Sequence, residues 1–309
     1  MFNFEYTYIN FPLLGLEFNP PRLFGYGNIQ VYFYGILIAL GLMLAVAYAW
    51  KRCSQFGIKD DALTDGVLWI VPFAIICARL YYVAFKWDMY AENPISILHI
   101  NKGGLAIYGG VIGAVIGVLV HCKVKKIKVA ALLDLVALGF LIGQSIGRWG
   151  NFFNREAFGA VTDVPWKMGL LEAATGKYIW VHPTFLYESL WNAIGFVLLH
   201  FVSKKRKYDG QVALGYAAWY GLGRAFIEGL RSDSLYWGPF RVSQLLAAIS
   251  CFAAVVVLML MSFKRHDPAN LFVNQVAAAE AAIEEEEDEE PAETEDTVEE
   301  ASEEAETEE

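Results

Sequence analysis

The sequence has few cysteines and few charged residues for its length. Only 4 of the 309 residues are cysteine, and no two of them have the C-x-x-C spacing. Asp, Glu, Lys and Arg make up 19% of the chain, below the roughly 25% that is usual in soluble domains. Hydrophobic residues make up 56%. This composition argues against a disulfide-built secreted module and against a soluble single-domain enzyme.

Basic residues are absent from the end of the chain. The segment from Glu280 onward holds 18 acidic residues and no Lys or Arg, so the rest carries a net charge of +8 although the whole chain carries −10. The segment also lacks aromatic residues and cannot bury a core. We therefore predict a basic, apolar body over residues 1–266 and a disordered acidic tail over residues 267–309.

Common metal and nucleotide motifs are missing as well. The chain has no H-E-x-x-H or H-x-x-x-H and no glycine-rich nucleotide loop. We therefore predict no metal and no cofactor, and we expect no nucleic-acid partner. The start, MFNFEYTYINFPLL, has no basic n-region and no cleavage site, so no removable signal peptide is expected.

Long apolar runs are abundant. Seven windows with at most two charges each can supply the ~17–25 residues that a helix needs to cross about 30 Å of hydrocarbon. The runs lack the period-two alternation of barrel strands. We predict an all-α integral membrane protein with seven transmembrane helices. The expected helices cover residues 28–50, 66–85, 104–121, 129–147, 183–202, 211–230 and 241–263.

The basic clusters predict the orientation of these helices. Four clusters follow the first, third, fifth and seventh helices, which are alternate connections, as the positive-inside rule requires. They are Lys51-Arg52-Lys59, Lys123-Lys125-Lys126-Lys128, Lys204-Lys205-Arg206-Lys207 and Lys264-Arg265. We therefore place the N-terminus outside and the C-terminal tail in the cytoplasm. Segments 86–102, 148–181 and 231–240 then face outward, and 148–181 is long enough to form a small head.

Ionisable residues inside the spans are candidates for function, because each costs roughly 2.5–3.5 kcal/mol on insertion scales. The sixth helix has the most. Tyr220, Arg224, Glu228 and Arg231 are spaced by four, four and three residues, which places them on one helical face. The alternative interpretation is a self-satisfied pair of Arg224 and Glu228 that only faces neighbouring helices.

The fourth helix ends in a second polar group. Gly139, Gly143 and Gly147 recur every four residues and predict close helix packing. Packing does not account for the polar residues that follow within nine positions, which are Arg148, Asn151, Asn154, Arg155 and Glu156. Guanidinium and amide donors suit a lipid phosphate. An aromatic belt with snorkelling arginines is the alternative.

Further polar residues are expected at the outer ends of the other helices. In chain order they are Tyr34, Arg79, Tyr108 (between Gly104 and the pair Gly109-Gly110), His182 and Glu188. Five of the polar residues, on five helices, are expected at a shared depth near the outer leaflet: Arg79, Tyr108, Arg148, Glu188 and Arg224. A single polar cavity that opens outward accounts for them most simply, and its excess of Arg over Glu favours an anionic ligand.

The run from Gly147 to Gly159, GRWGNFFNREAFG, resembles the signature G-R-x-G-N-F-x-N-x-E-x-x-G of the bacterial prolipoprotein diacylglyceryl transferases. Three other runs are similar to motifs of that family and follow in its order. They are GGLAIYGG at 103–110, HPTFLYE at 182–188 and YGLGRAFIEGLRSD at 220–233. The resemblance covers about residues 25–265, which is the whole body without the tail.

The resemblance implies an enzyme at the outer face of the bacterial plasma (inner) membrane. It would move the diacylglyceryl group from phosphatidylglycerol to the lipobox cysteine thiol of a prolipoprotein signal peptide. A thioether would form and glycerol phosphate would leave, as the first step of lipoprotein maturation. Phosphatidylglycerol, the prolipoprotein and membrane lipids are the partners that it implies.

Residue roles follow from the same resemblance. Arg148 and Arg224 would bind the phosphate and stabilise the negative charge that grows as the C–O bond breaks. Asn151 would add neutral donors. Tyr34, Tyr220 and Arg79 would complete the phosphatidylglycerol site. Glu156 would hold Arg148 or Asn151, Glu228 would hold Arg224, and Gly159 would permit a tight turn. The other supporting residues are Gly104, Gly109, Gly110, Asn154, His182, Glu188 and Arg231.

The identity of the general base stays open. A thiol with a pKa of about 8.5 is only a few per cent thiolate at neutral pH, so it needs a base or a positive field. Many members of the family have a histidine, and others a tyrosine, just before the Gly-Gly of the third helix, where this chain has Tyr108. The candidates are Tyr108 as phenolate, Glu156, or the arginine field acting on the thiol itself. We favour Tyr108 as a positioning hydrogen-bond donor.

An organic-anion transporter is the alternative function, with Arg79, Arg148 and Arg224 as its binding site. Such a transporter predicts paired halves with internal repeat symmetry. No convincing repeat relates the first three helices to the last three, and the odd number of spans disfavours it. A membrane scaffold that recruits partners with its acidic tail would leave the intramembrane charges unexplained.

Overall fold

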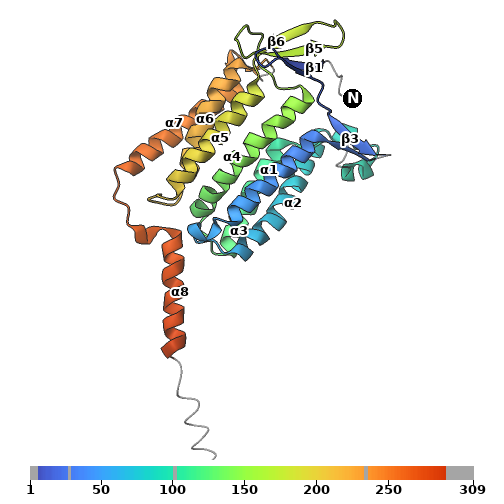
Figure 1. The fold of residues 1–309 in the computed structure, drawn as a ribbon. Helices are drawn as coiled ribbons and strands as arrows, with labels where there is room; N and C mark the ends of the chain where they lie inside the picture. Colours follow the sequence, from blue (N-terminus) through green and yellow to red (C-terminus); the bar gives the residue numbers. More distant parts are fainter. Residues whose placement is uncertain (1–5, 27–28, 100–102, 233–235, 290–309) are drawn as a thin grey trace, which may run out of the picture.

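The computed structural model describes residues 6–26, 29–99, 103–232 and 236–289 of the chain. Its body is a bundle of long helices with short strands at one end (Figure 1). A helix lies at each of the seven expected positions. They are α1 (Phe33–Trp50), α2 (Asp60–Phe85), α3 (Ile107–Val124), α4 (Val129–Asn154), α5 (Thr184–Ser203), α6 (Gln211–Leu230) and α7 (Val242–Ser262).

Six helices in the described part of the chain, α1 to α5 and α7, are long and apolar enough to cross a membrane. The chain is therefore a multi-pass membrane protein. The remaining long helix of the body, α6, packs along α5 and α7 but is not among the six by composition. It carries Arg224 and Glu228, which lower its apolar content.

Three helix boundaries differ by more than three residues from the expected ones. α1 begins at Phe33 because the residues before it pair as two antiparallel strands, β3 (Leu23–Tyr26) and β4 (Ile29–Tyr32). α2 begins six residues early, at Asp60, where acidic side chains in the first turn favour a helix start. α4 continues to Asn154 and ends only where Arg155 adopts the left-handed conformation, with φ of 55°.

Close approach of helices at glycine is confirmed in two places. A Cβ added at Gly41 of α1 would lie 3.2 Å from the Cα of Gly143 in α4. A Cβ at Gly109 of α3 would lie 2.5 Å from the carbonyl oxygen of Cys77 in α2. A backbone atom cannot move away from such a contact unless the two helices move apart. The small residues therefore set how closely α1 packs on α4 and α3 packs on α2.

The expectation of an all-α protein is wrong for the segments outside the bundle. β1 (Tyr6–Phe11), β2 (Leu16–Phe18), β5 (Met168–Glu172) and β6 (Tyr178–Val181) form an antiparallel sheet in the order β2-β1-β5-β6. A second small hairpin joins β7 (Tyr236–Trp237) to β8 (Phe240–Arg241). Strands this short leave no long apolar run, and β1 pairs with β5 across more than 150 residues, so no local pattern indicates the sheet.

An apolar cluster joins the sheet to the bundle. Ile9 and Leu170 from the sheet pack with Phe152 at the end of α4 and Phe185 at the start of α5, and all four are buried. Several short 3-10 turns connect the other elements. They are η1 (Cys53–Phe56), η2 (Trp87–Met89), η3 (Pro94–Leu98) and η5 (Pro268–Asn270). The sheet therefore covers the bundle end at which the fourth helix finishes and the fifth begins.

A buried aspartate caps the start of α6 at the opposite end of the bundle. The buried Asp134 of α4 accepts hydrogen bonds from the backbone N–H groups of Gly210 and Ala213, both at 2.8 Å. It thereby satisfies two of the free N–H groups at the start of α6. The intramembrane charge of α4 thus serves the packing of α6 rather than a ligand site.

The expected disorder of residues 267–309 is wrong for the part that the structure describes. η5 and helix α8 (Phe272–Glu289) follow α7, and α8 extends away from the bundle (Figure 1). Asp209 accepts a hydrogen bond from the N–H of Phe272, and Lys59 forms an ion pair with Glu280 at 2.8 Å. The alanine-rich run from 276 to 282 also has high helix propensity. Residues 290–309 lie outside the described part.

Candidate functional site

Five charged side chains from three helices meet at the end of the bundle beneath the sheet. We call Arg148, Glu188, Arg224, Glu228 and Arg231 the charged cluster. Glu188 of α5 contacts Nη2 of Arg148 with Oε2 at 2.6 Å and Nη1 of Arg224 with Oε1 at 2.9 Å. Glu228 contacts Nη2 of Arg224 at 2.6 Å. One guanidinium of α6 is therefore held by two carboxylates from two helices.

Arg231 completes the charged cluster just after the end of α6. Its Nη1 lies 3.8 Å from Oε1 of Glu188, and its Nε lies 3.9 Å from Oε2 of Glu228. The polar face predicted on α6 thus contains an ion pair within the helix, Arg224 with Glu228, as the alternative interpretation proposed. It is also joined to α4 and α5, which a pair confined to α6 would not require.

Charge and burial make the cluster a suitable anion site. Three arginines and two glutamates give it a net charge of +1. The glutamate side chains are only 5% and 3% exposed, whereas those of Arg148 and Arg224 are 22% and 16% exposed. The carboxylates therefore orient the guanidinium groups from the buried side, and the guanidinium groups keep the accessible side. Preorganised cations of this kind stabilise a phosphate whose charge increases.

Amide groups extend the site along the end of α4. Asn151 and Asn154 donate from Nδ2 to the same Glu156 oxygen, at 3.2 and 3.1 Å. Nη1 of Arg148 donates to Oδ1 of Asn151 at 3.4 Å. Glu156 therefore contacts Asn151, which is one of the two contacts expected for it.

A pair of serines joins α4 to α5 beside the charged cluster. Oγ of Ser145 donates to the carbonyl of Ser189 at 2.9 Å, and Oγ of Ser189 donates to the carbonyl of Ser145 at 2.8 Å. Nε1 of Trp149 donates to Oγ of Ser189 at 3.1 Å. Ser189 follows Glu188 directly, and Trp149 follows Arg148. These hydrogen bonds therefore hold Arg148 of α4 and Glu188 of α5 at the same level along the two helices.

A pair of tryptophans joins α5 to α6 in the same way. Each indole of Trp191 and Trp219 donates to the backbone carbonyl of the other at 2.9 Å, and the rings stack with centroids 4.3 Å apart. The rings lie over Gly195 and Gly223, where an added Cβ would come within 2.3 and 2.2 Å of an indole nitrogen. The sequence analysis missed these two residues. Their signal was the spacing of four residues between each Trp and a Gly on the same helix.

Two predicted tyrosines lie on either side of the end of α4. Tyr34 of α1 packs against Gly150, where a Cβ would lie 2.3 Å from its ring. Tyr220 of α6 stacks on Tyr216, whose hydroxyl accepts a hydrogen bond from Gln144 of α4 at 2.8 Å. Both therefore lie on helices that border the charged cluster, in positions consistent with a lipid headgroup site.

Within the described part of the chain, Arg79 and Tyr108 form no hydrogen bond and no ion pair with the charged cluster. The guanidinium of Arg79 is buried and donates to the carbonyls of Ser96, Ile97, Gly103 and Gly104 at 2.7 to 3.0 Å. A Cβ at Gly104, whose φ is +81°, would lie 2.2 Å from that guanidinium. These contacts favour a structural role for Arg79 in holding the segment between α2 and α3.

Tyr108 lies in the first turn of α3 and is 68% exposed. Within the described part of the chain it forms no hydrogen bond and no contact with a charged-cluster residue. Gly109 and Gly110 follow it and face α2, where an added Cβ at Gly110 would meet Ala78 at 3.6 Å. The first turn of α3 thus leaves Tyr108 exposed at the surface of the bundle.

Gly159 and His182 connect the outer segment to the bundle. The N–H of Gly159 donates to the carbonyl of His182 at 2.9 Å, and a Cβ at Gly159 would lie 2.6 Å from the His182 side chain. The glycine is therefore required by close approach, whereas a positive φ occurs at Arg155 and Ala157 instead. The ring of His182 contacts the Tyr187 hydroxyl at 3.2 Å.

Arg155 is a structural residue whose role the sequence analysis missed. It is buried and donates to the carbonyls of Pro20 at 2.7 Å and Phe153 at 3.1 Å, and to the side chain of Asn19. Burial, with a smaller contribution from nearby Arg22, lowers the pKa of Arg155 to about 10, so the side chain stays protonated at neutral pH. It therefore anchors the N-terminal strands to the end of α4.

Comparison with known proteins adds a further observation to this geometry. Residues 21–260 match the model of the family described as prolipoprotein diacylglyceryl transferase. This chain belongs to that family. The charged cluster and both asparagines lie inside the matched range. The signature run at 147–159 begins with the last two turns of α4. It continues through Arg155, which donates to the carbonyl of Pro20, and Gly159, which donates to the carbonyl of His182.

Curated relatives agree with this assignment. A phosphatidylglycerol–prolipoprotein diacylglyceryl transferase of Clostridioides difficile is 42% identical over 242 residues, which cover 78% of this chain and 94% of the relative. One from Finegoldia magna is 46% identical over 231 residues, covering 74% and 91%. One from Listeria welshimeri is 40% identical over 248 residues, covering 78% and 90%. The similarity therefore spans nearly the whole length of each relative.

Proposed function

We propose that this transferase moves the diacylglyceryl group of phosphatidylglycerol to the lipobox cysteine thiol of a prolipoprotein signal peptide. The names of its relatives support these substrates. The observation that carries the proposal is the charged cluster, whose net charge of +1 matches the single negative charge of a phosphodiester. The phosphodiester of phosphatidylglycerol is thus the natural ligand for Arg148 and Arg224.

The proposed reaction requires the acceptor thiol, the lipid, a proton acceptor and the residues of this site. The thiol sulfur forms a C–S bond with the diacylglyceryl carbon, and the C–O bond between that carbon and the phosphate breaks. The electron pair leaves with the oxygen as glycerol phosphate, and the thiol proton passes to a base or to the leaving phosphate. Arg148 and Arg224 stabilise the growing charge, and Asn151 adds a neutral donor.

The roles of the remaining residues follow from their positions. Tyr34 and Tyr220 border the headgroup, Glu156 positions Asn151, and Glu188 with Glu228 orients the arginines. We propose that the arginine field lowers the pKa of the bound acceptor thiol, since a positive charge within a few ångströms favours the thiolate. Tyr108 then serves as a hydrogen-bond donor to the acceptor peptide at the outer start of α3. We propose no contact of Arg79 with lipid.

The proposed orientation has seven membrane spans, α6 included, in the bacterial plasma (inner) membrane. The N-terminal sheet lies outside and α8 lies in the cytoplasm. The basic loops after α1, α3 and α5 lie at the same end of the bundle as α8, and the charged cluster lies at the other end (Figure 1). By the positive-inside rule the cluster then faces the outer leaflet.

The transfer can be tested by release of glycerol phosphate from headgroup-labelled phosphatidylglycerol. The assay contains the purified protein in lipid, and a lipobox peptide carrying either Cys or Ser at the acceptor position. We expect release with the Cys peptide only, and loss of that release in Arg148→Ala. Release that is equal with the Ser peptide, or that persists in Arg148→Ala, would contradict the proposal.

A further inference from the structure

Two side chains at the start of α7 bind the backbone of α6 beside the charged cluster. Arg241 directly precedes α7, and its Nη1 donates to the carbonyl oxygen of Glu228 at 2.7 Å. Gln244 lies in the first turn of α7, and its Nε2 donates to the carbonyl oxygen of Ala225 at 2.8 Å. Because Ala225 follows Arg224 directly, one bond reaches a member of the charged cluster and the other reaches the neighbour of a second member.

The bond from Arg241 caps the end of α6. The last four carbonyl groups of an α-helix have no N–H partner within the helix, and α6 ends at Leu230. The carbonyl of Leu230 accepts from the N–H of Ala160 at 2.7 Å. The carbonyl of Glu228 accepts from Arg241 and, at 3.2 Å, from the N–H of Arg231. A guanidinium group at this end also interacts favourably with the helix dipole. Arg241 therefore holds the turn of α6 that carries Glu228.

Both donors are themselves held in place. Nε of Arg241 donates to the hydroxyl of Tyr236, its partner across the hairpin of β7 and β8, at 2.8 Å. A Cβ added at Gly229 of α6 would lie 3.3 Å from Nε2 of Gln244 and 3.8 Å from Nη1 of Arg241. Gly229 thus leaves space for both side chains to reach the backbone of α6.

We propose that Arg241 and Gln244 are positioning residues that hold Arg224 in place for the reaction. Their role rests on the proposed function, in which Arg224 stabilises the charge on the leaving phosphate. Neither side chain needs to touch lipid, because the two bonds fix the level and the rotation of α6. The guanidinium of Arg224 then meets Glu188 at 2.9 Å and Glu228 at 2.6 Å. Because charge stabilisation depends on donors that are already in place, a displaced α6 lowers the rate of transfer more than the affinity for lipid.

Variants of the two residues separate positioning from lipid binding. Arg241→Met keeps the apolar stem of the side chain and removes its donors. In the full chain, we expect kcat for the release of glycerol phosphate to fall by about tenfold and the Kd for phosphatidylglycerol to change by less than about twofold. Arg241→Lys retains a donor for the carbonyl of Glu228 and should recover kcat to within about threefold of the wild type. Gln244→Met loses the bond to Ala225 and should show the same separation with a smaller loss.

Combination with Arg224→Lys shows whether the effect passes through Arg224. That variant has no planar guanidinium group left to position. We therefore expect Arg241→Met to lower kcat by less than about twofold in the Arg224→Lys background, since changes within one functional unit are not additive. A general loss of structure would instead lower kcat by the same factor in both backgrounds.

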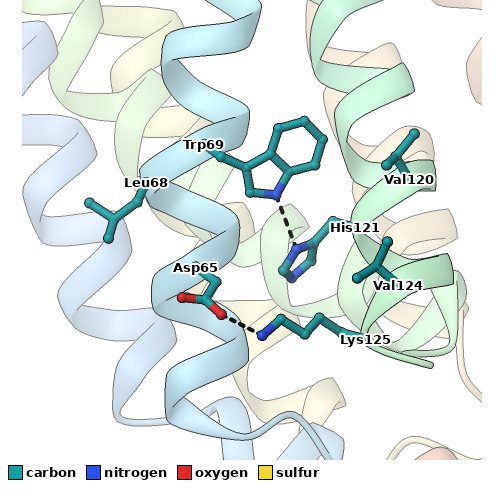
Figure 2. Close-up of a pocket in the computed structure, with 7 residues that line it drawn as sticks. All are labelled: Asp65, Leu68, Trp69, Val120, His121, Val124 and Lys125. Atoms are coloured by element: carbon teal, nitrogen blue, oxygen red, sulfur yellow. Dashed lines mark hydrogen bonds and ion pairs between the residues drawn. The ribbon is translucent and has the colours of Figure 1, made fainter.

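The matched control removes a hydrogen bond between two other helices. A groove of about 530 Å³ lies between α2 and α3, and beside it Nε1 of Trp69 donates to Nδ1 of His121 at 3.2 Å (Figure 2). Trp69→Phe loses this bond, which does not involve α6. Its Tm should fall, but its kcat should stay within about twofold of the wild type.

The outcomes distinguish this role from the proposed function. Absence of release by the wild-type protein would contradict both. Release by the wild type, together with an unchanged kcat in both Arg241→Met and Gln244→Met, would overturn the positioning role alone. So would a loss confined to Kd, an equal loss of kcat in Trp69→Phe, or additive losses in Arg241→Met/Arg224→Lys.

Discussion

Glu188 determines the arrangement of the charged cluster more than any other residue. Its two oxygens contact arginines from different helices, and its side chain is 5% exposed. Replacing a buried carboxylate between cations leaves those cations without a counter-charge, which is far more costly than losing a surface ion pair. The residue is therefore a positioning group whose effect on catalysis passes through Arg148 and Arg224.

We expect Glu188→Gln to lower kcat/KM by about 10²-fold, similar to the loss of one charge-stabilising donor. The free energy of unfolding should fall by about 1–3 kcal/mol, because the ion pairs of Glu188 with Arg148 and Arg224 become neutral hydrogen bonds. Steady-state kinetics and thermal unfolding in detergent measure both effects. Asp163→Asn, whose side chain is 99% exposed, is the control and should change neither. Wild-type activity in Glu188→Gln would show that the cluster is only structural.

Tyr108→Phe separates the candidates for the base. Removing a general base costs about 10²–10⁴-fold in rate. Because Tyr108 is exposed and forms no hydrogen bond with the arginines in the described part of the chain, we expect kcat/KM to fall by less than about 10²-fold, with no change in the shape of its pH profile. A larger loss with an altered pH profile would instead identify Tyr108 as the base.

Sequence analysis found the members of the charged cluster because ionisable residues in apolar helices are costly and therefore conspicuous. It could not show that Arg79 binds four backbone carbonyls, since those carbonyls belong to a segment 17 to 25 residues away in sequence. Nor could it show the serine and tryptophan contacts between α4, α5 and α6. Uncharged side chains give no comparable signal, and their partners depend on helix rotation.

At the scale of elements, the site depends on three helices whose spacing is set by small residues. Helices α4, α5 and α6 each contribute charged residues, and the serine and tryptophan pairs lie within about one and a half turns of them. The helices themselves were predictable from long apolar runs. The outer sheet was not, because its strands are short and its central pairing joins distant parts of the chain.

Gly223→Ala should separate α5 from α6, because the new Cβ would lie 2.2 Å from Nε1 of Trp191. Overpacking of this kind costs about 1–3 kcal/mol in the free energy of unfolding. We expect a lower Tm and a loss of activity, since Arg224 follows Gly223 directly. Gly143→Ala is the matched control, because its Cβ would meet nothing within 4 Å. Equal Tm values for the two variants would contradict the proposed role of the tryptophan pair.

At the scale of the whole molecule, charge is divided between two ends. The charged cluster lies at the sheet end, and the basic loops and the acidic α8 lie at the other. Phe272 packs on the buried cluster at that end, and Lys59 pairs with Glu280. Helix α8 is thus attached to the body, but none of its contacts reaches the charged cluster.

Truncation after Asn270 should therefore leave kcat/KM within about twofold of the full chain and lower the Tm. The loss in Tm reflects the packing of Phe272 and the exposed ion pair of Glu280, of which the pair contributes about 0–1 kcal/mol. Truncation after Ile283 keeps both contacts and should have the Tm of the full chain. Loss of activity after either truncation would show that the tail takes part in the reaction.

The central claim is that Arg224, held by Glu188 and Glu228, stabilises the charge that develops on the leaving phosphate. Arg224→Lys keeps the charge but cannot contact both carboxylates and a phosphate with a planar fork. The most direct measurement is kcat, alongside the Kd for phosphatidylglycerol, in this variant. We predict that kcat falls by about 10²-fold while Kd rises by less than about tenfold, because the lost interaction is strongest in the transition state. An unchanged kcat, or a loss confined to Kd, would contradict the account.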